Sequence, residues 1–294
     1  MTKRERAQER VAALHLHAQR VAERAQAERV RHGSLDALFE MADRDAEVGG
    51  GIMAGALAYR LFIWLLPLAL VAIAGLGIAS SAASESPSSA ARSGGLGGLV
   101  SSSVASAASS SARWYALLIG IPVLVFTTRS LLRALIVSHR LVWTDLRERT
   151  PRPTLRSTVR LLGALVAVLV VSALASTVRH VSGVAGLLVT LAIALPYAAL
   201  WLLISEQLPH RDATWRGLVP GALVFGLGLE ALHLVTVFLL APFAESKQST
   251  YGSLGLAAAL LLDLYLMSRI VIATAVVNAT LWERRSRTAG PPRA

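Results

Sequence analysis

Six stretches of this 294-residue chain are apolar for long enough to cross a lipid bilayer. A helix needs about 20 largely apolar residues to span the roughly 30 Å of hydrocarbon in a membrane. The six windows are residues 52–79, 114–138, 159–178, 184–204, 218–240 and 254–281. Because only helices and closed barrels satisfy their backbone hydrogen bonds in lipid, the sequence predicts an all-α integral membrane protein with six transmembrane helices.

The positive charge is distributed unevenly between the two sides that these crossings define. Arginine and lysine are frequent before the first span, between the second and third, between the fourth and fifth, and after the sixth. The opposite side holds only Arg92, Arg113, Arg179 and Lys247. Since cytoplasmic loops retain positive charge during insertion, we expect both termini to lie in the cytoplasm. The net charge of +11 would then face anionic headgroups of the inner leaflet, so membrane lipids and not nucleic acid are the expected partners.

The chain contains no cysteine, which excludes a disulfide framework, thiolate metal ligands and a thiol nucleophile. Its N-terminal segment is charged, and the first apolar stretch is long enough to remain as an uncleaved span instead of serving as a signal peptide. These features are typical of a multi-pass protein of the bacterial inner membrane.

The sequence divides into four parts. Residues 1–33 are predicted to form a basic cytoplasmic helical segment, 34–50 an interfacial amphipathic helix, 51–282 the six-span membrane domain, and 283–294 a basic cytoplasmic tail. Within the membrane domain, an exterior loop rich in serine, alanine and glycine covers residues 80–113.

Apolar spacing predicts two helices before the first span. Between Ala7 and Ala25, weakly apolar residues recur at heptad spacing, which fits either a basic helix near the inner leaflet or a coiled coil that would make a homo-oligomer. In the second helix an apolar face is predicted to rest on the membrane. Its charged residues, among them Asp36, Glu40 and Arg44, are expected to face water.

Ionisable side chains at membrane depth are the first candidates for function. Placing one at the centre of a bilayer costs about 2.5 to 3.5 kcal/mol, so such residues usually face a partner, the bundle interior or a water-filled cavity. The candidates for a substrate-binding cavity are Arg60, Arg129, Glu230, His233, Asp263 and Arg269.

Spacing along the helices limits how these candidates pair. Glu230 and His233 are three residues apart and share a helix face, which suits a structural hydrogen bond, a proton relay or two metal ligands. Two ligands do not make a metal site, so we expect no bound metal. Asp263 is expected to bridge to Arg60 or Arg129 on another span. Because the deep arginines outnumber the deep carboxylates, one positive charge would remain for an anionic ligand.

Glycines spaced four residues apart favour close contact between membrane helices. Gly51 with Gly55 and Gly217 with Gly221 have this spacing. We therefore expect helix packing at both pairs.

Several short patterns occur in a fixed order along the spans. They are residues 58–60 and 65–67 in the first span, 208–209, 215–216 and 220–222 leading into the fifth, and 251–255 before the sixth. Together they resemble the YihY/BrkB family of bacterial inner-membrane proteins over almost the whole membrane domain. The Tyr-Gly-Ser-Leu-Gly run at 251–255 is the most specific. The positions that the resemblance assigns to the family pattern are Tyr59, Pro67, Pro209, Pro220, Gly221, Tyr251, Gly252, Gly255 and Asn278.

The resemblance implies a membrane protein, whose relatives have been labelled as ribonuclease BN, as virulence or serum-resistance factors, and as transporters. The chain departs from the family pattern in two places. Trp64 stands where many members have a small polar residue. Val276 and Val277 stand where many members have a glutamate before the asparagine matched here by Asn278. If that glutamate serves a shared activity, this chain lacks it or uses Asp263.

The sequence offers no recognisable catalytic constellation. Metal-assisted cleavage of RNA needs clustered carboxylates or histidines, but the predicted cytoplasmic loops hold only scattered Asp145, Glu148, Glu206, His210 and Asp212. There is also no nucleophile elbow and no phosphate-binding loop. We therefore expect neither an enzyme nor a bound cofactor.

Two functions fit these observations. The first is a transporter or flippase of an amphiphilic, anionic envelope component, with the deep arginines as counter-charges in a cavity between spans. The alternative is a noncatalytic membrane scaffold of the cell envelope, whose buried charges only pair. The two differ in whether the deep charged residues line one hydrated cavity or are satisfied by their neighbours.

Overall fold

The computed structural model describes residues 33–82, 110–144, 152–178, 183–240 and 253–288, and all regular structure in these ranges is helical. The prediction of an all-α fold is therefore confirmed. In chain order the elements are α2 (Gly33–Glu47), α3 (Gly50–Ala82), α6 (Ser110–Val142), α7 (Leu155–Val178), α8 (Gly183–Ser205), α9 (Trp215–Val235), the π-helical turn η1 (Thr236–Leu240) and α11 (Ser253–Thr288).

Six helices of the described part are long and apolar enough to cross a membrane, namely α3, α6, α7, α8, α9 and α11. They coincide with the six predicted spans. The helices α3 and α6 reach further than expected into the predicted exterior loop 80–113, and most of that loop lies outside the described residues. The basic segment before α2, with its heptad spacing, also lies outside them.

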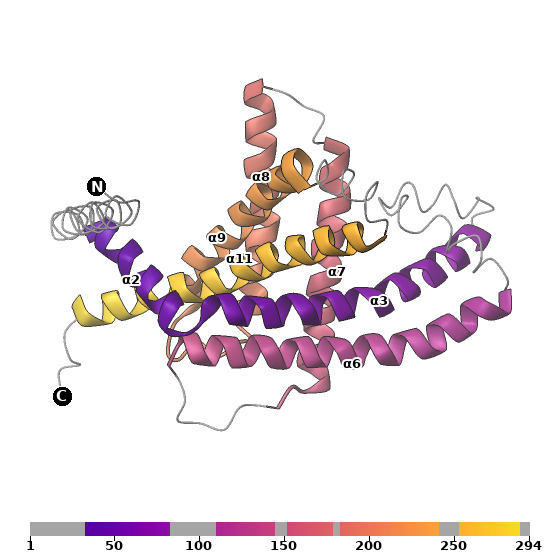
Figure 1. Cartoon of the computed structure of the whole chain (residues 1–294), viewed down its shortest axis with the longest axis horizontal. Helices are drawn as coiled ribbons and strands as arrows, with labels where there is room; N and C mark the ends of the chain where they lie inside the picture. The colour runs from indigo at the N-terminus through magenta and orange to yellow at the C-terminus, as the bar shows by residue number, and fades with distance from the viewer. Residues whose placement is uncertain (1–32, 83–109, 145–151, 179–182, 241–252, 289–294) are drawn as a thin grey trace, which may run out of the picture.

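The six spans form a closed ring. Around it, each helix contacts the next in the order α3, α6, α7, α8, α9, α11, and α11 returns to α3. In Figure 1, α3 and α6 run side by side, whereas α7 and α8 run in a clearly different direction. We call the end of the ring where α3 begins and α6 ends the α2 end, because α2 lies there. At the opposite end, α3 and α6 diverge from α7 and α8 (Figure 1).

Ion pairs fasten α2 to the last turns of α11. Arg44 donates two hydrogen bonds to the carboxylate of Glu283, at 2.8 and 2.7 Å. Arg284 donates to Asp36 at 2.7 Å and to Glu40 at 2.8 Å. The expectation that Asp36, Glu40 and Arg44 face water is therefore wrong. The physical reason is that α11 continues as a helix to Thr288, past the predicted start of the tail, and carries its charges alongside α2.

Small residues allow α9 to approach its neighbours closely. A Cβ on Gly226 would overlap the backbone carbonyl of Ala194 in α8, and one on Gly221 would overlap backbone and side-chain atoms of α11. The packing predicted from glycine spacing is thus confirmed at Gly221. At Gly55, in contrast, a Cβ would meet no atom within 4 Å, so the spacing alone did not identify a close contact there.

The first prediction concerns this packing. The substitution Gly226→Ala should lower the free energy of unfolding in detergent by about 1 to 3 kcal/mol, and with it the melting temperature. The reason is that an added methyl group has to displace the backbone of α8. The matched control is Gly163→Ala, since a Cβ at Gly163 meets nothing within 4 Å. A melting temperature that falls equally in both variants would contradict this helix arrangement.

The second prediction concerns the attachment of α2. Burial alone would raise the pKa of the Glu40 carboxyl, but hydrogen bonds from Arg284 and Arg287 outweigh burial and hold that pKa below its ordinary value of 4.5. A depressed carboxyl pKa gives stability that is fully present above the unfolded-state pKa and is lost as the pH falls through the folded-state pKa.

Wild type should therefore be more stable than Glu40→Gln at pH 7, by about 1 kcal/mol or less for a partly exposed pair. This difference should shrink as the pH is lowered below 4.5. Thermal unfolding of both proteins across that range measures it. A difference that stays constant or grows on acidification would show that the ion pairs do not hold α2.

Candidate functional site

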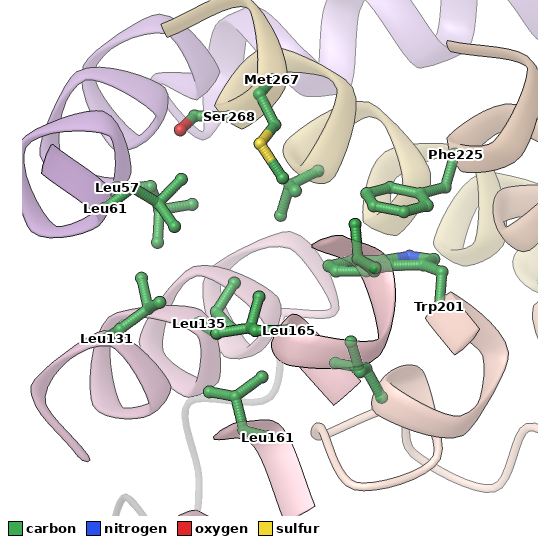
Figure 2. Close-up of a pocket in the computed structure, with 13 residues that line it drawn as sticks. Leu57, Leu61, Leu131, Leu135, Leu161, Leu165, Trp201, Phe225, Met267 and Ser268 are labelled. Carbon is green, nitrogen blue, oxygen red and sulfur yellow. The ribbon is translucent and has the colours of Figure 1, made fainter. Parts of the chain in front are cut away.

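All six helices of the ring meet around one apolar centre, shown in Figure 2. The cavity there has a volume of about 30 Å³, which is room for no more than a water molecule or two. We call this centre the central seal. It is lined by Leu57, Leu61, Leu131, Leu135, Leu161, Leu165, Val168, Trp201, Ile204, Phe225, Met267, Ser268 and Val271.

The central seal lies toward the α2 end of the ring. Leu57 is about two turns into α3, and Leu135 is about two turns before the end of α6. Ile204 occupies the last turn of α8. Helices that run in opposite directions therefore contribute their side chains at the same level, which is what a single constriction across the ring requires.

Few polar atoms reach the central seal. Trp201 stacks on Phe225 with ring centroids 4.3 Å apart, and its Nε1 donates a hydrogen bond to Thr274 Oγ1 at 3.0 Å. The hydroxyl of Ser268 is buried and has no hydrogen-bond partner among the described residues. Hydrophobic constrictions disfavour the passage of water and ions, and the apolar lining and small volume of this centre have that character.

The six predicted cavity residues do not line the central seal. Arg60 hydrogen-bonds to the hydroxyl of Ser130 and also donates to its carbonyl, at 3.4 Å. Asp263 accepts a hydrogen bond of 2.8 Å from Thr236, and this contact takes the place of the expected bridge to an arginine. These two residues therefore do not share one hydrated cavity. Each forms hydrogen bonds with a different neighbouring helix: Arg60 with Ser130 of α6, and Asp263 with Thr236 of η1.

The remaining candidates are also dispersed. Arg269 donates two hydrogen bonds to the carboxylate of Asp45, at 3.1 and 2.8 Å, whereas Arg129 is exposed on the surface of α6. Glu230 is buried in α9, and His233 is half-buried one turn further along the helix. In the part of the chain that the structure describes, no group of three or more His, Asp or Glu side chains could hold a metal ion.

Two further pockets flank the central seal, and sequence reasoning missed both. One is an apolar groove of about 550 Å³ between α7 and α8, lined by Val171, Leu174, Ala175, Val189, Ala192, Ile193 and Pro196. The other, which we call the basic pocket, measures about 720 Å³ and lies at the α2 end, where α6 ends and α7 begins. Its signal in the sequence was the arginine content of the loops after the second and fourth spans.

Two residues of the family pattern, Gly221 and Asn278, meet in the structure. The N–H of Gly221 donates to Asn278 Oδ1 at 2.7 Å, which joins α9 to α11. Pro209 lines the basic pocket, Pro67 is buried in α3, and Tyr59 is exposed. The helix α9 contains Pro220, and α11 contains Gly255. Tyr251 and Gly252 lie outside the described residues.

The residues that depart from the family pattern, Trp64 and Val276, also fit their surroundings. Trp64 donates from Nε1 to Thr128 Oγ1 at 2.8 Å, so its large ring is anchored between α3 and α6. Val276, which replaces part of the expected glutamate motif, is buried in the core. An apolar side chain suits that position, because a lone carboxylate there would be costly.

The family model named Virulence factor BrkB matches residues 46–294. The chain belongs to the Virulence factor BrkB family. This match begins near the end of α2 and includes every helix of the ring, so the resemblance seen in the sequence is confirmed. Neither the curated proteins nor the solved structures contain a match. The six apolar helices and membership of the BrkB family identify the chain as a multi-pass membrane protein.

The third prediction tests whether Arg269 of this BrkB-family protein is held by Asp45. In a double-mutant cycle, Asp45→Asn and Arg269→Gln should show a coupling energy between about 0.5 and 3 kcal/mol in unfolding free energy. The reason is that each single change leaves a partly buried polar partner without its counter-charge. Asp45→Asn combined with Arg129→Gln is the control pair and should be additive. Additive effects in both cycles would contradict the pairing.

Proposed function

We propose that this BrkB-family protein is a noncatalytic transporter or flippase that moves an amphiphilic, anionic component of the bacterial envelope across the inner membrane. The observation that carries the proposal is the series of three spaces along the ring. The basic pocket lies at the α2 end, the central seal follows, and the apolar groove lies beyond it.

These spaces are close neighbours along the helices. Leu131 and Leu135 line the central seal, and the adjacent Leu132 and Ile136 line the basic pocket. On the other side, Val168 lines the central seal and lies only three residues before the first groove residue of α7, a rise of about 4.5 Å along a helix. A small separation of the side chains in the central seal would therefore connect the basic pocket with the apolar groove.

The groove is suited to acyl chains. Its lining is entirely aliphatic apart from the ring of Pro196, and it lies between α7 and α8. A proline inside a membrane helix removes a backbone hydrogen bond and allows a bend. Such a bend in α8 would let the side chains of the central seal separate. The contact of α8 with α9, which is more extensive than its contact with α7, would be kept.

We place the α2 end in the cytoplasm, because positively charged segments are retained there during insertion. The arginines of the described part support this placement, since many of them gather at that end. They include Arg140, Arg152, Arg156, Arg211, Arg216, Arg284, Arg285 and Arg287.

The structure changes the expected role of the deep arginines. Arg269 is paired with Asp45, Arg60 hydrogen-bonds to Ser130, and neither lines any of the three spaces, so they are not the counter-charges of this proposal. In this proposal, passage is controlled when the apolar side chains of the central seal move apart. The negative charge of the substrate is bound by the arginines at the α2 end.

A noncatalytic scaffold is the alternative, and the same local pairing favours it. A scaffold needs buried charges that are satisfied and a ring that stays closed. The ion pairs between α2 and α11 would then serve to present a fixed surface at the α2 end, with no passage through the ring.

The fourth prediction separates the two functions. The full chain is reconstituted into vesicles with a fluorescent phosphatidylglycerol, and chemical quenching of the outer leaflet measures lipid movement. Wild type should accelerate movement over protein-free vesicles. Leu135→Ser should increase the rate roughly tenfold, which corresponds to a barrier lower by about 1.4 kcal/mol, because a hydroxyl weakens the central seal.

Two variants control this experiment. Val137→Ser makes a comparable change on the same helix, but its side chain is 41% exposed whereas that of Leu135 is 5% exposed, so it should leave the rate unchanged. Leu131→Phe fills the small cavity and should slow movement. If wild type and Leu135→Ser both match protein-free vesicles, transport of anionic lipid is excluded and the scaffold is favoured.

A further inference from the structure

The basic pocket, which the proposed transport uses at the α2 end, has a lining that indicates one class of ligand. Its buried lining includes Leu132, Ile136 and Leu208, which are between 2% and 6% exposed, and the charged Arg140, which is 7% exposed. The same lining also contains exposed charged residues, namely Arg152, Arg211 and Asp212. A space with an apolar floor and a cationic rim matches a molecule that carries both an apolar part and an anionic group.

Cations outnumber anions in the lining. Among the described residues that line it, Arg140, Arg152 and Arg211 carry guanidinium groups and Asp212 carries a carboxylate. The carboxylate of Glu283, which Arg44 binds at 2.7 Å, also lies 4.0 Å from the Arg211 guanidinium. A guanidinium presents its N–H groups as a planar fork that matches two oxygens of a phosphate group. The excess of guanidinium groups therefore favours a phosphate-type ligand over a neutral or cationic one.

Arg211 is held in place on the rim. Its Nη2 donates to the hydroxyl of Thr144 at 3.0 Å and to the carbonyl of Thr144 at 3.3 Å. Its guanidinium also lies 5.7 Å from the ring centroid of Trp282, a distance at which a cation is attracted to an aromatic face. A preorganised arginine loses little further side-chain freedom when an anion binds.

The backbone at this contact is strained. In the described part of the chain, the non-glycine residues with positive φ are Thr144, at 50°, and Arg211, at 49°. Residues other than glycine rarely adopt a positive φ, and such backbone strain is concentrated at functional sites. These two residues contact each other, because the Arg211 guanidinium hydrogen-bonds to Thr144, and Arg211 itself lines the basic pocket.

The first turn of α7 adds hydroxyl groups to the same rim. Thr154 and Ser157, which both line the pocket, cap the helix reciprocally: the N–H of Ser157 donates to Thr154 Oγ1 at 3.1 Å and the N–H of Thr154 donates to Ser157 Oγ at 3.0 Å. The start of a helix carries a partial positive charge. It therefore reinforces the field of the three guanidinium groups.

From these observations we propose that the basic pocket is a binding site for the phosphate headgroup of an anionic phospholipid. The headgroup lies among Arg140, Arg152 and Arg211, and the first carbons of the lipid rest on the apolar floor. The site lies where α6 ends and α7 begins, which is the level of the headgroups in a membrane. This inference rests on the proposed function, because the basic pocket is where that function meets the charge of its substrate. Binding is measured below without any movement of lipid, so a failure of binding can be distinguished from a failure of transport.

Native mass spectrometry of the full chain, released from neutral detergent, tests the proposal. The protein is titrated with short-chain phosphatidylglycerol, with phosphatidylcholine of the same chain length, and with glycerol phosphate. Wild type should bind phosphatidylglycerol at least ten times more tightly than phosphatidylcholine. Glycerol phosphate should bind at least ten times more weakly than phosphatidylglycerol, because it cannot use the apolar floor.

Matched variants locate the site. The double variant Arg152→Gln with Arg211→Gln should lose at least tenfold in affinity for phosphatidylglycerol. Arg156→Gln removes the same charge from an exposed residue of the same helix start that does not line the pocket, and it should change affinity less than twofold. Should the double variant fail to fold, Arg152→Gln alone, at an exposed position, should still lose about threefold.

Three results would overturn the proposal. Equal losses in Arg152→Gln and Arg156→Gln would show that lipid responds only to the general charge of the α2 end. Equal affinity for the anionic and the zwitterionic lipid would show that the guanidinium groups do not recognise the headgroup charge. Glycerol phosphate that binds as tightly as phosphatidylglycerol would show that the pocket takes a soluble phosphate compound and not a lipid.

Discussion

Inside a bilayer, helices gain little by hiding apolar side chains from their surroundings, because lipid tails are as apolar as leucine. Close packing and hydrogen bonds between helices must supply the association. In this protein α3 packs most extensively on α6 and α8 on α9, while α11 joins these pairs, since it contacts α3, α6 and α9 as well as α2. The N–H of Gly221 donates to Asn278, Trp201 donates to Thr274, and Arg269 holds Asp45. The ring and the position of α2 both depend on these contacts of α11.

Closure of the ring by apolar side chains follows from that arrangement. With the polar contacts of α11 directed to its neighbours, the centre is left to leucine, valine and aromatic side chains, and about 30 Å³ of space remains. Charged groups gather instead at the α2 end, where the chain turns between helices. The protein thus separates an apolar centre from a charged end, which is an arrangement that either a transporter or a fixed scaffold could use. We base our preference for the transporter on the three spaces that adjoin one another along α6 and α7.

The sequence predicted the parts of this structure that depend on one helix at a time. Hydropathy located all six spans, and the order of short motifs identified the BrkB family. Contacts between distant segments were harder, because spacing along a helix defines a face but not the residue that meets it. Arg44 was placed in water, yet it binds Glu283, which lies 239 positions later. The basic pocket combines α6, α7 and the loop before α9, so no single pattern could have revealed it.

The most direct test of the central seal is the accessibility of single cysteines. Because the chain has no cysteine of its own, each introduced thiol reports on one position. A membrane-impermeant maleimide is added to either side of sealed vesicles that contain Leu131→Cys, Leu135→Cys or Arg152→Cys. The account predicts that Arg152→Cys reacts from the cytoplasmic side alone and that the two positions of the central seal react from neither side. Rapid labelling of Leu135→Cys from either side would reveal a hydrated centre and contradict it.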